Sequence, residues 1–400
     1  MSPLKRFPEY RKLFLAQVLS LAGSGISTVA LALLAYDLAG DRAGAVLGTA
    51  LALKMFAYVV LAPIMSAWVS RLPKKGWLVT LDGLRAIMVM LLPWVDALWQ
   101  IYLLILLINA CSAGFTPAYQ ALLPRVLPER GDYLKALSLS RLAYDLEQLL
   151  SPLAAALLLS LIGFRQLFML DSLTFMVSGC LIFFCTLPQD AAGGGPRPSL
   201  TAGLRHYLSV PRLRSLWGAY LAVASASAMA IVNTVLVVTQ RTGGGERETA
   251  LTMAAMGLGS MLVALMLPRW LEGRSPRNTL LAGALLLTLA LALAIPATLW
   301  PLLLALWFLL GIGCSLIQTP AGVLITASGE SHQQPGLFAA HFSLTHLCWF
   351  ATYLLAGWGS ATLGLSLTFG MMAVLSLLGL LMAWSQGRGG ENQVSLEAKC

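Results

Sequence analysis

Charged side chains are scarce in this sequence. Asp, Glu, Lys and Arg make up 11% of its 400 residues, whereas a water-soluble domain carries about 25%. Hydrophobic residues reach 58%, and the mean hydropathy is +0.79. No polar stretch is long enough to form a soluble domain, which excludes most classes of enzyme. We therefore expect a membrane protein without enzymatic activity.

The apolar residues lack the alternation of membrane strands. A membrane β-barrel alternates polar and apolar residues over segments of about ten residues, and runs such as 285–293 do not. A spanning helix needs about 20 apolar residues. Stretches of this kind lie near 13–38, 44–69, 77–95, 99–122, 136–160, 166–187, 213–239, 249–267, 278–295, 300–324, 337–360 and 363–385. The sequence predicts an all-α membrane protein with twelve transmembrane helices.

Several features of secreted proteins and of ATP-dependent transporters are also absent from the sequence. Five of the six cysteines fall within predicted helices and the sixth is Cys400, so no exterior disulfide is expected. The glycine run at 243–245 is not followed by the Lys-Ser or Lys-Thr pair of a phosphate-binding loop. The first apolar stretch is too long for a cleavable signal peptide. We expect no cofactor, and an ion gradient rather than ATP as the energy source.

The chain repeats itself. Residues 111–118 are echoed by 314–321 and residues 138–144 by 343–349, in the same order and at nearly the same offset. This pattern predicts two related six-helix halves, residues 1–187 and 212–385. The segment 188–211, rich in glycine and proline, is expected to be a flexible cytoplasmic linker, and 386–400 a disordered cytoplasmic tail.

Basic residues are unevenly distributed between the predicted loops. Most of the 26 lysines and arginines lie in the N-terminal segment, alternate loops, the linker and the tail, whereas only Arg42, Arg165, Arg241 and Arg247 occupy the other loops. This bias follows the positive-inside rule and places both termini in the cytoplasm. The sequence pI of 9.4 is therefore interpreted as a topology signal, and no nucleic-acid partner is expected.

Four ionisable residues lie well inside predicted helices, namely Lys54, Arg141, Asp145 and Glu147, and Asp171 lies a few residues into the predicted helix 166–187. A charge at the bilayer centre costs about 2.5–3.5 kcal/mol on insertion scales, so each needs a reason. One hypothesis is that Asp145 or Glu147 binds and releases a proton during transport, with Arg141 and Lys54 tuning the site. The alternative is a set of ion pairs that holds helices together, since Arg141 and Asp145 have i,i+4 spacing.

Other charges lie nearer the ends of predicted helices. Asp82 and Arg85 have i,i+3 spacing and are expected to form a structural ion pair. Asp37 closes the first predicted helix and is expected to lie at the membrane interface.

Two of the four histidines, His341 and His346, fall in one predicted helix together with Cys348. Imidazole and thiolate suit nickel, cobalt and zinc, so these three are candidate metal ligands. Five residues separate the two histidines, which places them on different faces of a helix. Hydrogen bonding across the bundle is the alternative role. Asp171, Asn109 and Gln318 are further candidates for binding substrate or protons.

Several segments resemble a known family. Residues 10–17 (YRKLFLAQ), 82–85 (DGLR) and 115–118 (FTPA) look like the drug:proton antiporter-3 branch of the major facilitator superfamily. Residues 136–147 (ALSLSRLAYDLE) look closer still to NreB-type nickel-resistance exporters. The resemblance implies the major facilitator fold, with two pseudo-symmetric halves and a substrate path between them. The tail 386–400 lacks the histidines in which such nickel exporters often end.

The expected function is proton-coupled antiport that extrudes nickel or a similar divalent cation across a bacterial inner membrane. The expected partners are this ion, protons and the lipid bilayer, and the protein is expected to be a monomer. One alternative is efflux of an organic drug or siderophore by the same fold. A second is a non-transporting membrane sensor or scaffold.

Overall fold

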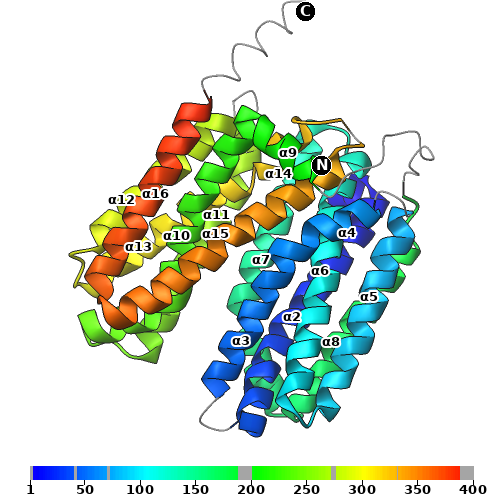
Figure 1. Ribbon diagram of the computed structural model, residues 1–400, viewed down its shortest axis with the longest axis horizontal. Helices are drawn as coiled ribbons and strands as arrows, with labels where there is room; N and C mark the ends of the chain where they lie inside the picture. Colours follow the sequence, from blue (N-terminus) through cyan, green and yellow to red (C-terminus); the bar gives the residue numbers. More distant parts are fainter. Residues whose placement is uncertain are drawn as a thin grey trace, which may run out of the picture. The chain divides into compact units, whose positions relative to one another are not determined.

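The computed structural model describes residues 3–39, 43–69, 73–187, 201–271, 276–330 and 332–387 (Figure 1). These residues form helices joined by turns. In chain order the helices are α1 (Pro3–Arg6), α2 (Pro8–Ala39), α3 (Ala43–Phe56), η2 (Ala57–Leu61), α4 (Ala62–Val69), α5 (Lys74–Leu91), η3 (Leu92–Trp94), α6 (Leu98–Val126), α7 (Arg130–Leu159), α8 (Phe164–Phe183), α9 (Ala202–Ser209), α10 (Pro211–Val237), η4 (Val238–Thr242), α11 (Glu246–Trp270), α12 (Pro276–Ala294), α13 (Trp300–Gln318), α14 (Ala321–Thr326), α15 (Gln334–Thr362) and α16 (Leu365–Gly387).

The helices follow the apolar stretches of the sequence. Each of the twelve predicted stretches coincides with one long helix or with a run of consecutive helical segments. Among the described residues, nine helices are long and apolar enough to cross a membrane. Backbone hydrogen bonds are satisfied within a helix, which is why apolar segments of this length adopt it in lipid.

Part of the expected linker is helical. Residues 202–209 form the short helix α9, whereas 188–200 and the tail from 388 lie outside the described residues. The glycine run 193–195 and the prolines Pro196 and Pro198 precede residue 201, so they do not oppose a helix after it.

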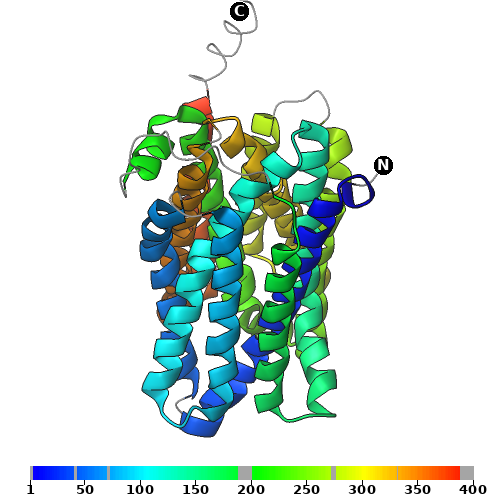
Figure 2. The same ribbon diagram turned by 90° about the vertical axis from the view of Figure 1, so that its right-hand side faces the viewer.

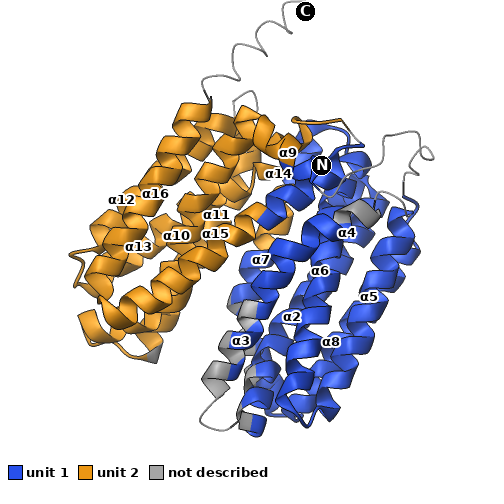
Figure 3. Ribbon diagram, in the orientation of Figure 1, with its two compact units in different colours: residues 1–136, 143–204, 331–343 blue, residues 137–142, 205–330, 344–400 orange. Residues whose placement is uncertain are grey.

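Contacts divide the chain into two compact units (Figure 3). Unit 1 comprises residues 1–136, 143–204 and 331–343, and unit 2 comprises residues 137–142, 205–330 and 344–400. Two helices are therefore divided between the units, so that each unit includes a short segment of a helix that otherwise belongs to the other unit. These segments are part of α7 in unit 2 and the start of α15 in unit 1.

Unit 1 is a bundle of long helices, seen side by side in Figure 2. Helix α2 packs against α8, α8 against α5, and α5 against α6, which also contacts α3. The core between α2, α6 and α8 contains the fully buried Leu34, Ile101, Leu167 and Phe168. Large apolar side chains on the interior faces hold this bundle together.

Unit 2 is built in the same manner from α10, α11, α12, α13, α15 and α16. Helix α10 packs against α16, α12 against both α16 and α13, and α13 against α11. Helix α15 is bound to α10 by polar contacts, because Thr352 Oγ1 donates to Ala224 O at 3.2 Å and Asn233 Nδ2 donates to Ala356 O at 3.1 Å.

The outer faces of these helices are also apolar. Leu157, Leu265, Met266 and Leu367 each expose more than half of their surface, and many other large apolar side chains are exposed. Contiguous apolar surface of this kind is rare on soluble monomers. It is the surface expected of helices that face lipid.

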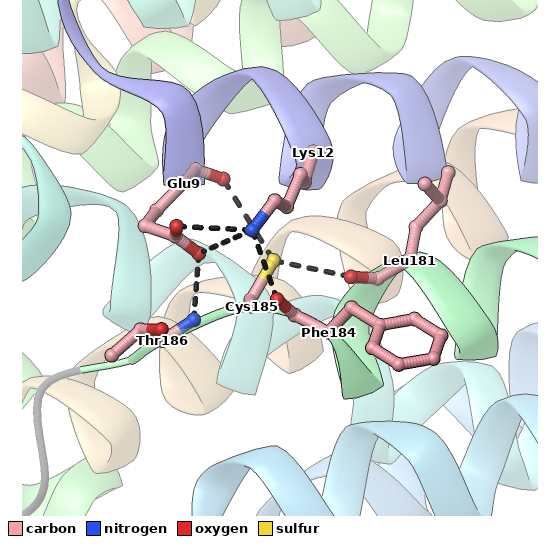
Figure 4. Close-up of polar contacts among 6 residues, drawn as sticks. All are labelled: Glu9, Lys12, Leu181, Phe184, Cys185 and Thr186. Carbon is pink, nitrogen blue, oxygen red and sulfur yellow. Dashed lines mark hydrogen bonds and ion pairs between the residues drawn. The ribbon is translucent and has the colours of Figure 1, made fainter.

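Polar contacts tie the start of α2 to the end of α8 (Figure 4). Lys12 Nζ lies 3.1 Å from Glu9 Oε1 and donates to Phe184 O at 2.9 Å. The Thr186 amide donates to Glu9 Oε2 at 2.6 Å. Burial raises the pKa of the Cys185 thiol to about 11, so this cysteine stays protonated and unreactive.

A second tie at the same end of unit 1 joins α1 to the start of α7. Arg6 Nη2 lies 2.7 Å from Glu129 Oε1, and Arg6 Nη1 lies 2.9 Å from Asp132 Oδ2. The hydrogen bond from Arg6, followed by its charge, lowers the pKa of the Glu129 carboxyl from its ordinary value of 4.5. This carboxylate therefore contributes stability that is present above pH 4.5 and lost as the pH falls through its lowered pKa.

Replacing Arg6 by alanine is expected to make the stability less sensitive to acid below pH 4.5, because the Glu129 pKa then returns towards its ordinary value. The effect is small and decreases with salt, since the pair is exposed. The midpoint of thermal unfolding, measured against pH at low and high salt, checks this. Arg11→Ala, which removes an exposed arginine near the same end, is the control. Identical acid slopes for Arg6→Ala and the intact protein would contradict the prediction.

Candidate functional site

In unit 1, Glu147 lies just past the middle of α7 and faces α2. A Cβ atom added to Gly25 of α2 would overlap the Glu147 carboxylate and the Ser151 hydroxyl. The absence of a side chain at Gly25 thus allows both polar groups to lie against the α2 backbone. Ser151, one turn further along α7 and buried, is hydrogen-bonded to Glu147.

Lys54 is the basic residue that interacts electrostatically with Glu147. It lies near the end of α3 and places its Nζ 5.7 Å from the Tyr58 ring centroid. In the part of the chain that the structure describes, no carboxylate forms an ion pair with Lys54 within 4.0 Å. The two predicted residues are therefore brought into one electrostatic environment without a direct salt bridge.

The helix that carries Lys54 is irregular just beyond it. Residues Ala57–Leu61 form the π-helical turn η2, a form that is frequent at functional sites. Ser343 Oγ donates to Val59 O within this turn, and the Phe342 ring lies 4.9 Å from the Tyr58 ring. The start of α15 thus contacts η2 inside unit 1.

Asp171 lies on the other side of α2. Its carboxylate accepts a hydrogen bond from Ser27 at 2.5 Å. The Thr174 hydroxyl, which donates to the Asp171 backbone carbonyl at 2.8 Å, also lies 3.3 Å from the carboxylate. A Cβ atom on Gly23 would overlap the Asp171 and Thr174 side chains. Among the described residues no basic side chain lies within ion-pair distance of Asp171.

Asp82 and Arg85 form the ion pair expected from their spacing. Ser178 of α8 donates to Asp82 Oδ2 at 2.8 Å. The Arg85 guanidinium carbon lies 4.2 Å from the Phe115 ring centroid and 4.5 Å from that of Phe175. With its charge paired and its faces covered by rings, this pair is a structural element that joins α5, α6 and α8.

In unit 2, Arg141 and Gln318 are brought together. Arg141 Nη1 donates to Gln318 Oε1 of α13, and Arg141 Nε donates to Ser260 Oγ of α11 at 3.0 Å. Arg141 also interacts electrostatically with the hydroxyl of Tyr220 of α10. This cluster joins a guanidinium to neutral acceptors on two helices.

The three candidate metal ligands are divided between the units. His341 is buried in the unit 1 segment of α15, whereas His346 and Cys348 belong to unit 2. The His346 ring lies 5.0 Å from the Trp349 ring, which in turn lies 6.2 Å from Tyr220. Within the described ranges, no group of three or more His, Cys, Asp or Glu side chains is placed to hold a metal ion.

The two remaining candidates, Asn109 and Asp145, lie in unit 1. Asn109 Nδ2 donates to Ile105 O, one turn earlier in α6, at 2.7 Å, so one donor of the amide is used within its own helix. Asp145 is buried in unit 1 and, two residues from Glu147, lies on a different face of α7.

Sequence reasoning missed the hydroxyl partners of the two acids, Ser27, Ser151 and Thr174, as well as Ser260. The spacings Glu147 to Ser151 and Asp171 to Thr174 are i,i+4 and i,i+3, which could have suggested these two pairs. Nothing local could have indicated Ser27 or Ser260, because their partners lie far away in the sequence.

Comparison with known proteins gives a consistent result along the chain. A family model described as Major Facilitator Superfamily matches residues 13–274 and 216–397. Two transporters of Bacillus subtilis (strain 168), the uncharacterised MFS-type proteins YfiS and YvqJ, are 24% and 22% identical. The YfiS match covers 81% of this chain and 80% of YfiS, and the YvqJ match covers 86% and 85%.

Solved structures share the fold at low sequence identity. The human organic anion transporter MFSD10 has a TM-score of 0.79 at 16% identity, covering 96% of this chain and 100% of that one. A bacterial homologue of the iron transporter ferroportin has a TM-score of 0.74 at 15% identity, covering 94% and 98%. The E. coli fucose:proton symporter FucP has a TM-score of 0.76 at 13% identity, covering 96% and 99%.

Proposed function

Because the chain belongs to the Major Facilitator Superfamily, whose members are membrane transporters and not enzymes, we propose that it exports an organic compound in exchange for protons. The observation that carries this proposal is the environment of Glu147, an acid in a membrane-spanning bundle that is hydrogen-bonded to Ser151 and has no ion-pair partner among the described residues. Such a carboxyl group can bind and release a proton.

Because Lys54 interacts electrostatically with Glu147, protonation of Glu147 changes the net charge of the site. While Glu147 is ionised, its charge and that of Lys54 cancel at a distance, and protonation leaves one net positive charge. A bound substrate with a polar or charged group therefore interacts differently with the two states. This differential interaction is what couples proton binding to substrate binding.

An organic substrate fits the surroundings better than a metal ion. The Tyr58 ring lies beside Lys54, and the Phe342 ring packs against Tyr58. Pockets for organic ligands combine such apolar surface with a few polar groups. No three-residue group of metal-ligating side chains exists among the described residues. The likeness to MFSD10, described as an organic anion transporter, supports the same class.

Nickel or a similar divalent cation is the second candidate. His346 and Cys348 of α15 offer nitrogen and sulfur donors suited to such ions. The resemblance of residues 136–147 to NreB-type exporters and the likeness to a bacterial ferroportin homologue also favour it.

We also propose in which membrane the protein lies, on which side its termini are, and in which direction it transports. The distribution of basic residues supports an inner-membrane protein with both termini in the cytoplasm. The resemblance of residues 10–17 and 82–85 to drug:proton antiporters supports export as the direction of transport. We infer that a monomer carries out the cycle.

Everted membrane vesicles from an efflux-deficient bacterial host test this function. Energised vesicles with the intact chain are expected to accumulate ethidium, an aromatic organic probe, and to release it when a protonophore collapses the proton gradient. Glu147→Gln is expected to reduce accumulation to the level of vesicles without the protein, because glutamine cannot exchange a proton. Glu129→Gln, which changes an exposed carboxylate outside the helices, is the control and should transport normally.

The same vesicles separate the alternatives. Accumulation of radioactive nickel without ethidium would replace the organic substrate by the metal, and His346→Ala should then abolish it. Transport of either probe by Glu147→Gln at the normal rate would exclude Glu147 as the coupling carboxylate. Absence of transport for both probes would favour the non-transporting sensor or scaffold.

A further inference from the structure

The second buried acid of unit 1 has a distinctive set of partners. Asp171 is only 2% exposed, yet its carboxylate contacts two hydroxyls, Ser27 Oγ of α2 and Thr174 Oγ1 of its own helix. An ionised carboxylate buried without a cation is costly. Its surroundings therefore have to accommodate the neutral, protonated form as well.

Hydroxyl partners can serve both protonation states. A serine or threonine hydroxyl donates to a carboxylate but can rotate and accept a hydrogen bond from a carboxylic acid. Asp82 also accepts a hydrogen bond from a hydroxyl, that of Ser178, but it is in addition paired with the Arg85 guanidinium, which can only donate and therefore favours the ionised form. Among the described residues Asp171 is thus hydrogen-bonded to hydroxyls without a paired cation, whereas Asp82 has both a hydroxyl and a paired guanidinium.

Charged groups near Asp171 are few. From α5, Arg85 acts on it electrostatically at longer range and is itself paired with Asp82. From α2, the groups facing it are Ser27 and the backbone at Gly23. The third element packed against α8, η3, contains Leu, Pro and Trp and no ionisable side chain.

Glu147 and Asp171 are arranged alike around α2. Each acid lies against a glycine of α2, Gly25 and Gly23 respectively, and each is hydrogen-bonded to a hydroxyl one turn further along its own helix. Two residues of an α-helix are about 200° apart around its axis. The two glycines therefore present opposite sides of α2 to the two acids.

We propose that Asp171, with Ser27 and Thr174, is a second proton-binding site of this transporter. Together with Glu147 it gives two protonatable carboxylates on opposite sides of α2. Movement of α2 relative to α7 and α8 would change the surroundings of both acids. This inference rests on the proposed function for its role in coupling, but proton binding by Asp171 can be tested without any substrate.

Infrared difference spectroscopy of the purified protein in lipid, recorded during a pH titration, measures the carbonyl band of protonated carboxyl groups directly. The intact protein is expected to show separate components from Asp171 and Glu147. Asp171→Asn should remove one component and leave the other, Glu147→Gln should do the reverse, and the double variant should lose both. Asp82→Asn is the control for a buried acid held by an arginine, and it should leave both components in place.

The outcomes are distinguishable. A titration of Asp171→Asn identical to that of the intact protein would overturn the proposal, because Asp171 would then never change its protonation state. If Asp171→Asn does not fold, Ser27→Ala keeps the acid but removes its hydrogen bond, and an unshifted midpoint of the Asp171 component would also overturn it. If the intact protein shows the Asp171 component but no titrating Glu147 component, the proposed function is contradicted and the Asp171 site is supported.

Discussion

Replacing Asp82 by alanine is expected to destabilise the protein by about 3–5 kcal/mol, the usual cost of removing one partner of a buried ion pair. Asp82 is fully buried and Arg85 is 5% exposed. Alanine would leave the guanidinium between the Phe115 and Phe175 rings without its counter-charge. The buried positive charge, rather than the lost contact itself, accounts for most of the cost.

The free energy of unfolding, measured in mixed micelles with a denaturing detergent, checks this prediction. Asp96→Ala, which removes an exposed acid beyond η3, should change it by no more than about 0.5 kcal/mol. Replacing both Asp82 and Arg85 by leucine should cost less than Asp82→Ala alone, because no unpaired charge remains. An Asp82→Ala protein as stable as the Asp96→Ala control would show that the pair contributes little.

Gly311→Ala is expected to destabilise unit 2 by about 1–3 kcal/mol through overpacking. Helices α11 and α13 approach so closely that a Cβ on Gly311 would overlap the Met256 carbonyl, and a Cβ on Gly259 would overlap the Phe308 carbonyl. Backbone atoms cannot rotate away, so the two helices must separate. Ser260, next to Gly259, would then move relative to Arg141, whose Nε donates a hydrogen bond to the Ser260 hydroxyl.

Gly257→Ala is the matched control for this prediction. Gly257 lies on the same helix, α11, but a Cβ there would meet no atom within 4 Å. Since alanine favours a helix over glycine by about 1 kcal/mol, Gly257→Ala should be neutral or slightly stabilising. Thermal unfolding of both variants in the same detergent distinguishes them. If Gly311→Ala were as stable as Gly257→Ala, the close approach of α11 and α13 would be refuted.

The fold was largely predictable from the sequence. The length of each apolar stretch determines a helix in lipid because backbone groups there must be paired within the segment. Proline was less informative. Thr116-Pro117 and Thr319-Pro320 are echoes of one another in the sequence. Yet α6 continues through Pro117, whereas α13 ends at Gln318 and α14 begins at Ala321.

Part of the candidate site was also predictable. Lys54, Arg141, Glu147 and Asp171 are conspicuous in the sequence because a charge is rare in an apolar helix. The sequence could not divide them into groups. Glu147 with Lys54 belongs to unit 1, and Arg141 with Gln318 belongs to unit 2. The relation between the two halves as repeats stays a prediction.

The sequence by itself determined that this is a helical membrane protein, and it identified the charges that need a reason to be there. Both follow from local properties, namely hydropathy, segment length and the cost of a charge in lipid. Only the tertiary structure decided which acids are held by arginine and which by hydroxyls. Ser27 and Asp171 are 144 residues apart, and they meet because Gly23 allows α2 and α8 to approach closely. Such a contact depends on side-chain packing between distant helices, which no local pattern specifies.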